Sequence, residues 1–185
     1  GRAVKANAYL RDVQAAQIEP AAICFHAVRA NSPRLVEVAV IQGAGPIGLS
    51  TLQWVRVAGA GTIIVVEPNE ARRKLSLALG AHHAVDPSEA NAFISDHTMG
   101  LGADIVYECA GIPATIQSAV DLARRGGRVA IIGLAMGDAP ISPRQWLTKE
   151  IQVSAALGYT HEEFEMTMGY VCLLYTSDAA DEHTG

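Results

Sequence analysis

Residues 43–48 read Gly43-Ala44-Gly45-Pro46-Ile47-Gly48, a G-x-G-x-x-G pattern that decides the fold of this 185-residue chain. The apolar run Val36–Ile41 precedes it, and Ile47–Ala58 follows with helical periodicity. In that setting Gly43 permits a tight turn, Gly45 lets the backbone approach a ligand, and Gly48 lets helix and strand pack closely. The unpaired N–H groups at the start of the helix then offer a site for a pyrophosphate.

An acidic residue closes the next strand along the chain. Thr62–Val66 is a β-branched run, and Glu67 follows it at the spacing where a carboxylate binds the adenosine ribose hydroxyls. Such a carboxylate repels a 2′-phosphate, which favours NAD over NADP. Arg72 and Arg73 are the opposing observation, because arginines near this point can accept that phosphate. Glu67 also has a plain interpretation as a solvated residue after a strand.

The rest of the chain alternates short apolar runs with helical segments. We expect helices at 12–30, 47–58, 70–79, 91–98 and 113–125, and strands at 36–41, 62–66, 83–85, 103–108, 128–132 and 151–157. Strands separated by single helices require right-handed crossovers and a parallel sheet that is covered on both faces. The sequence therefore predicts an α/β fold, a doubly wound, parallel, six-stranded Rossmann sheet with strand order 3-2-1-4-5-6, preceded by a helix.

Composition and charge exclude several classes of protein. Half of the residues are apolar, and the net charge is −5, from 14 basic and 19 acidic residues. We expect no nucleic-acid partner, because no dense basic run is present, and no membrane partner, because no apolar stretch approaches the roughly 20 residues of a span. Cys24, Cys109 and Cys172 lie far apart, which supports neither a disulfide framework nor a metal knuckle. A cytoplasmic location is the expectation.

Two other nucleotide-binding folds share parts of this pattern. Methyltransferases that use S-adenosylmethionine also have a glycine loop and an acid after the second strand, but they rarely keep the third glycine at this spacing. Short-chain dehydrogenases are disfavoured because no tyrosine is followed four residues later by lysine. The dinucleotide interpretation is the one that fits all three glycines.

Several further strings resemble the medium-chain, zinc-dependent alcohol dehydrogenases. They occur in that family's order: IEPAAICFHAV, GAGPIG, EPNEARRKLSLALGAHHAVDP, GADIVYECAG, GGRVAIIGL and KEIQVSAALGYTHEEFE. The resemblance covers roughly residues 12–170 and is greatest to the polyol and vicinal-diol branch, which includes 2,3-butanediol, sorbitol and threonine dehydrogenases. The stretch from Glu67 to Pro87 looks most like the butanediol enzymes.

The resemblance implies an oxidoreductase that transfers hydride from a secondary alcohol or vicinal diol to NAD, with zinc as the Lewis acid. Such a metal lowers the pKa of bound water from about 15.7 to about 7, and an alcohol is ionised by the same effect. One alternative is the zinc-free quinone reductase branch of the same fold, against which Glu19-Pro20 argues. Another is a non-catalytic NAD-binding module.

The resemblance also implies which residues contact the cofactor. The loop residues Gly43, Gly45, Pro46, Ile47 and Gly48 meet its phosphates, with Ile47 against the cofactor, while Glu67 and Arg72 reach the ribose. The remaining cofactor residues follow the later strands: Ala110 and Gly111 on the adenine side, and Ile132, Gly133, Leu134, Ala156 and Leu157 at the nicotinamide carboxamide.

One candidate metal residue stands outside these strand ends. Glu19, before Pro20, matches the acid that the polyol branch places beside the catalytic zinc, as a ligand or through water. Its plain interpretation is a carboxylate favoured by the dipole at a helix N-terminus. We interpret His26 as a packed helix histidine, His82-His83 as an ordinary segment before the third strand, and Cys24 and Cys109 as small apolar residues.

The family's upstream cysteine ligand, its Gly-His-Glu segment and the four-cysteine structural zinc lobe do not occur in this sequence, which begins with Gly1. We therefore expect a fragment that binds NAD, takes a small alcohol or diol as substrate only when full length, and then forms a homodimer or homotetramer. The expected division is 1–30 catalytic-domain tail and connecting helix, 31–160 NAD-binding domain, 161–171 returning helix, and 172–185 a tail that resembles a translated sequencing adapter.

Overall fold

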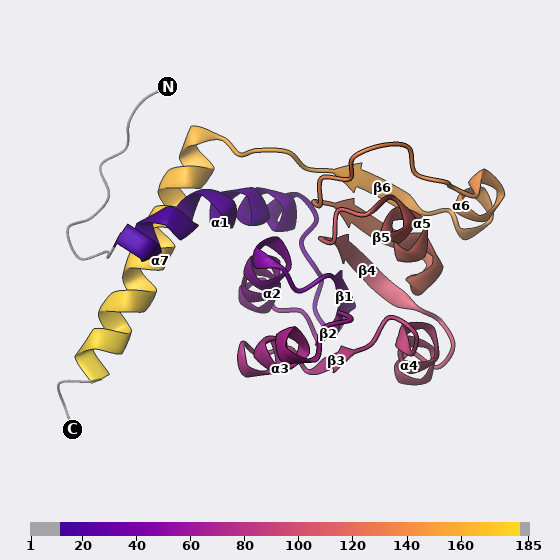
Figure 1. Ribbon diagram of the computed structural model, residues 1–185, viewed down its shortest axis with the longest axis horizontal. Helices are drawn as coiled ribbons and strands as arrows, with labels where there is room; N and C mark the ends of the chain where they lie inside the picture. Colours follow the sequence, from indigo (N-terminus) through magenta and orange to yellow (C-terminus); the bar gives the residue numbers. More distant parts are fainter. Residues whose placement is uncertain (1–11, 182–185) are drawn as a thin grey trace.

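The computed structural model describes residues 12–181 as a six-stranded parallel sheet between two layers of helices (Figure 1). The strand order is β3-β2-β1-β4-β5-β6, which confirms the predicted doubly wound topology. The strands are β1 (Val38–Gln42), β2 (Thr62–Val66), β3 (His83–Val85), β4 (Ala103–Glu108), β5 (Ala123–Ile131) and β6 (Gln152–Ala155). The helices are α1 (Asp12–Ala30), α2 (Pro46–Val57), α3 (Glu70–Ala78), α4 (Ala90–His97), α5 (Pro113–Leu122), α6 (Pro143–Lys149) and α7 (His161–Asp181).

Successive side chains of the central strands point to opposite faces of the sheet and so divide the core into two clusters. Ala39 and Ile41 of β1 belong to the cluster that packs under α1 and α2, whereas Val40 between them belongs to the cluster under α4 and α5. The same division runs through β2 and β4. Successive side chains of a strand point to opposite faces, so strands buried on both faces read as unbroken apolar runs.

The first strand begins later than the sequence predicts. The expected strand started at Val36, but the structure places Val36 in a turn with φ +63° and 89% exposure, and β1 begins at Val38. The chain turns before the strand there, since the Glu37 N–H donates to the Arg34 carbonyl at 3.2 Å and the Arg34 N–H donates to Glu37 Oε2 at 2.7 Å. An apolar, β-branched residue was mistaken there for the first residue of a strand.

The second half of the chain also differs from the expected boundaries. Helix α5 ends at Leu122, not at residue 125, because Ala123 is extended and pairs with Ala103 of β4 at the start of β5. Strand β6 is shorter than predicted and stops at Ala155. The seven-residue helix α6 was not predicted, and a Pro at its start is its main sequence signal.

Helices α1 and α7 pack against each other beyond the edge of the sheet, where α7 crosses α1 (Figure 1). The buried Glu163 joins them: its Oε2 lies 2.9 Å from His26 Nδ1 of α1 and accepts from the Thr160 N–H at 2.8 Å. The Glu163 N–H donates in turn to Thr160 Oγ1, which completes a capping box at the start of α7. His26 is therefore a packed helix histidine, as predicted.

Within the described part of the chain, none of the helices has the length and apolarity needed to cross a bilayer. Helix α7 continues to Asp181 and so enters the 172–185 segment. That segment's interpretation as an adapter-derived tail concerns its origin and stays a prediction, as do the other domain boundaries.

Candidate cofactor site

The glycine loop joins the carboxyl end of β1 to the first turn of α2. Gly43 has φ +89°, and its N–H donates to the Val66 carbonyl at 2.8 Å, so the loop turns sharply beside the end of β2. A Cβ on Gly48 would lie 1.9 Å from the Gly43 oxygen, which leaves space for glycine alone. A Cβ on Gly45 would meet nothing within 4 Å, so the backbone is open to a ligand there. Each glycine thus has the geometry that the motif predicts.

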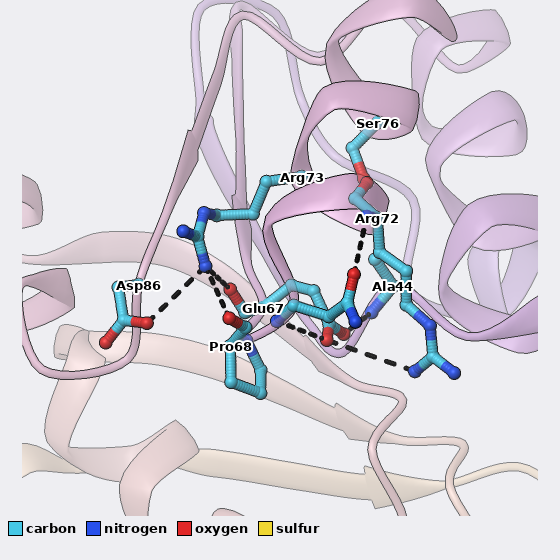
Figure 2. A network of polar contacts seen from close by, with 8 residues as sticks. Ala44, Glu67, Pro68, Arg72, Arg73, Ser76 and Asp86 are labelled. Atoms are coloured by element: carbon cyan, nitrogen blue, oxygen red, sulfur yellow. Dashed lines mark hydrogen bonds and ion pairs between the residues drawn. The ribbon is translucent and has the colours of Figure 1, made fainter.

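Glu67 lies directly against this loop, as Figure 2 shows. Its Oε2 accepts from the Ala44 N–H at 2.7 Å, and its Oε1 accepts from the Asn69 N–H at 3.0 Å. The residue is only 3% exposed, so the interpretation as a solvated residue after a strand is wrong. A carboxylate oxygen has two lone pairs, so each oxygen keeps acceptor capacity for a ligand hydroxyl.

The two arginines of α3 point in different directions (Figure 2). Arg72 Nη1 lies 3.9 Å from Glu67 Oε1, with more than half of its side chain exposed. Arg73 Nη1 instead donates to the Glu67 and Pro68 carbonyls, both at 2.7 Å, and lies 3.4 Å from Asp86 Oδ2. Arg73 is therefore held by the turn, whereas the exposed Arg72 lies near the Glu67 carboxylate.

The turns after β4 and β5 meet each other and the glycine loop. A Cβ on Gly43 would lie 3.0 Å from the Ala110 Cα, and one on Gly111 would lie 3.1 Å from the Leu134 N. A Cβ on Gly133 would lie 2.3 Å from the Gly111 N. These close backbone approaches bring the predicted cofactor residues of three strands to one edge of the sheet, outside its carboxyl ends.

The β6 end completes this edge. The Ala156 N–H donates to the Ile131 carbonyl at 3.0 Å, so the chain leaving β6 stays beside the end of β5. Ile132 is buried, whereas Leu134 is 74% exposed and Leu157 is 88% exposed. Both leucines thus present apolar side chains to solvent at this edge.

Glu19 lies on the exposed side of α1, and Tyr159, just after β6, lies close to it. Burial raises the pKa of the Tyr159 hydroxyl, and the charge of Glu19 and a hydrogen bond to it raise that pKa further. Glu19 is thus on the same side of the molecule as the β6 end. Among the residues that the structure describes, no three His, Cys, Asp or Glu side chains gather to hold a metal. Glu19 alone does not make a zinc site.

The other residues considered for chemistry have structural roles. Cys24 and Cys109 are buried, and burial raises the pKa of both thiols, which makes them poor nucleophiles. His82 Nδ1 accepts from the Ile63 N–H at 2.9 Å. The His83 ring packs against the rings of Phe93 and His97.

Sequence reasoning missed two polar residues at this edge. Asn69 caps α3, where its side chain accepts from the Arg72 N–H, and its own N–H orients Glu67. Its signal was a turn former directly before the helix. Glu108 ends β4, and its signal was an acidic residue at the end of a mostly apolar strand.

This chain is similar to known dehydrogenases in sequence and in structure. A family model described as "Zinc-binding dehydrogenase" matches residues 46–170, more than half of the chain. This chain belongs to the zinc-binding dehydrogenase family. Sorbitol dehydrogenase of Bacillus subtilis is 33% identical over 151 residues, which cover 80% of this chain and 43% of the relative. This member of the family therefore spans less than half of that relative's length.

Two solved structures of related dehydrogenases superimpose closely on this one. The 2R,3R-butanediol dehydrogenase of Bacillus subtilis has a TM-score of 0.80 at 30% identity and covers 90% of this chain and 48% of its own. A zinc-binding dehydrogenase of Sinorhizobium meliloti, solved with NADP, has a TM-score of 0.80 at 29% identity and covers 92% of this chain and 52% of its own. The shared fold covers about half of each solved dehydrogenase.

Proposed function

We propose that this chain is the NAD-binding part of a dehydrogenase that oxidises a secondary alcohol or vicinal diol. The observation that carries the proposal is the Glu67 carboxylate, held by the Ala44 N–H of the glycine loop at 2.7 Å. An acid in this position hydrogen-bonds ribose hydroxyls and repels a 2′-phosphate. The relative solved with NADP shows that the family also contains NADP binders, so the choice of NAD rests on Glu67 and on the engagement of Arg73 elsewhere.

The cofactor is proposed to lie along the carboxyl edge of the sheet. Its pyrophosphate meets the loop 43–48, its adenosine ribose meets Glu67 and Arg72, and its adenine side meets Ala110 and Gly111. The nicotinamide end is held by residues after β5 and β6, namely Ile132, Gly133, Leu134, Ala156 and Leu157. The open space at Gly45 and the exposure of Leu134 and Leu157 support this placement.

The substrate class follows from the relatives' names, which include sorbitol and butanediol dehydrogenases. Zinc would supply the Lewis acid for alcohol oxidation in the full-length protein. Of the described residues we propose only Glu19 beside that metal, so most ligands belong to other parts of the protein. A homo-oligomer, either a dimer or a tetramer, and a cytoplasmic location complete the proposal.

Two measurements test the function at different levels. Calorimetry on the chain should detect NAD binding, and the absence of any nicotinamide dinucleotide binding would refute the cofactor proposal. An assay of NAD reduction by the full-length protein with 2,3-butanediol, sorbitol and threonine, with and without chelator, tests the reaction. Failure with all three substrates would count against the dehydrogenase, and activity in protein that elemental analysis shows to hold no zinc would exclude the metal.

A further inference from the structure

Glu108 is a fully buried carboxylate at the end of a central strand, and none of the ion pairs in the described part of the chain involves it. A buried acid without a cation is costly unless hydrogen bonds stabilise it. Its position is central, because in β4 it is paired in register with Gln42 of β1 and Ile131 of β5. These are the strands whose ends carry the proposed cofactor residues.

Three donors converge on one oxygen of this carboxylate. Glu108 Oε1 accepts from the Ala110 N–H at 2.9 Å, from the Gly111 N–H at 3.0 Å and from the Thr115 hydroxyl at 2.7 Å. The side chain thereby folds the turn after β4 back onto the end of its own strand. Because two backbone N–H groups of the turn and one hydroxyl share this acceptor, the turn is held firmly.

The main chain of Glu108 holds the turn after β5 as well. Its carbonyl accepts from the Ile132 and Gly133 N–H groups, both at 2.9 Å. Its second carboxylate oxygen, Oε2, has no hydrogen-bond partner among the described residues and lies 2.8 Å from where a Cβ of Gly133 would stand. Glu108 thus contacts both turns. In the turn after β5, only glycine fits at position 133 beside the Glu108 side chain.

We infer that Glu108 is a positioning residue, which fixes the 110–111 and 132–134 turns at the spacing that the cofactor needs. That these turns contact the cofactor rests on the proposed function; that Glu108 holds them does not. The reach of the side chain is the decisive property, because Oε1 must lie within hydrogen-bond distance of two consecutive N–H groups. Its charge is secondary, since no cation faces it in the described structure.

Two variants of the full chain separate reach from charge. Glu108→Asp keeps the charge but withdraws the oxygens by one methylene, and Glu108→Gln keeps the reach of one acceptor oxygen without the charge. For Glu108→Asp we expect amide hydrogen exchange at Ala110 and Gly111 to become at least about tenfold faster, and the Kd for NAD to rise about tenfold. Glu108→Gln should stay within about threefold of the wild-type chain in both measurements.

Glu37→Asp is the matched control at the opposite end of the sheet. Glu37 is also buried, accepts from the Arg34 N–H at 2.7 Å and pairs with Arg128. Its shortening should lower the melting temperature and leave both the exchange of Ala110 and Gly111 and the Kd for NAD unchanged.

The outcomes distinguish this inference from the proposed function. Wild-type exchange at Ala110 and Gly111 in Glu108→Asp, or equal damage in Glu108→Gln, overturns the inference whether or not NAD binds. Faster exchange with an unchanged Kd overturns the link between these turns and the cofactor. If the wild-type chain binds no NAD, the proposed function fails, and accelerated exchange in Glu108→Asp alone still supports Glu108 as the residue that holds the turn.

Discussion

Replacing Glu67 by glutamine should erode the preference for NAD over NADP, because the charge of this carboxylate is what repels a 2′-phosphate. Glu67→Gln retains one oxygen that can accept from Ala44 or Asn69, which donate to the carboxylate at 2.7 and 3.0 Å. Loss of the other acceptor should cost about 1–3 kcal/mol of folding stability. The ratio of two Kd values on the same folded variant cancels that cost.

The magnitude follows from the charges around the site. Two unit charges 4 Å apart interact by about 4 kcal/mol at an effective dielectric constant of 20. Arg72 Nη1, 3.9 Å from Glu67 Oε1, offsets part of the repulsion. We therefore expect a change of roughly 2 kcal/mol, so that the ratio of the NADP Kd to the NAD Kd falls about 30-fold.

Isothermal titration of the wild-type and variant chains with each cofactor measures this ratio directly. Asp86→Asn is the control, because it removes a nearby carboxylate that faces Arg73, not the ribose position, and should leave the ratio unchanged. A Glu67→Gln ratio within about threefold of wild type would refute the electrostatic reasoning. In that case the choice of cofactor must be made by shape elsewhere along the sheet edge.

Three other changes test the fold around the site. Gly48→Ala should destabilise the chain by about 3 kcal/mol or more, because its Cβ would lie 1.9 Å from the Gly43 oxygen; wild-type urea unfolding would contradict this. Val36→Gly should raise stability by about 0.5–1 kcal/mol by relieving a left-handed backbone at an 89% exposed side chain, and a lower melting temperature would contradict it. Burial raises the pKa of Glu163, but hydrogen bonds from Thr160 and His26 outweigh burial and hold that pKa below the ordinary glutamate value. The stability that the Glu163–His26 pair contributes should therefore be lost as the pH falls through this lowered pKa. Melting curves in that acidic range should therefore depend less on pH for Glu163→Gln than for the wild type.

The glycine loop was predicted from local signals, and the strand order was inferred from the doubly wound topology that accompanies such a loop. Apolar runs alternate with helical segments, and the loop needs three glycines at fixed spacing. Features that depend on contacts between distant residues were not accessible. The engagement of Arg73, for example, depends in part on Asp86 from a different turn. The boundary at Ala123, where the chain leaves the helix and joins the sheet, likewise depends on pairing with the distant Ala103.

Glu67 and Glu108 show why a sequence pattern alone does not distinguish a binding residue from a positioning residue. Each is an acid at the end of a buried strand, and each accepts from the N–H two residues later. The difference lies in how the donors are distributed. Glu67 receives one backbone donor on each oxygen and has the exposed Arg72 above it, so acceptor capacity remains on the ligand side. Glu108 receives three donors on one oxygen, and its other oxygen is buried without a partner, so neither oxygen is open to a ligand. The same chemical group at the ends of β2 and β4, which lie on either side of β1, is thus proposed to select the cofactor in one case and to shape its site in the other.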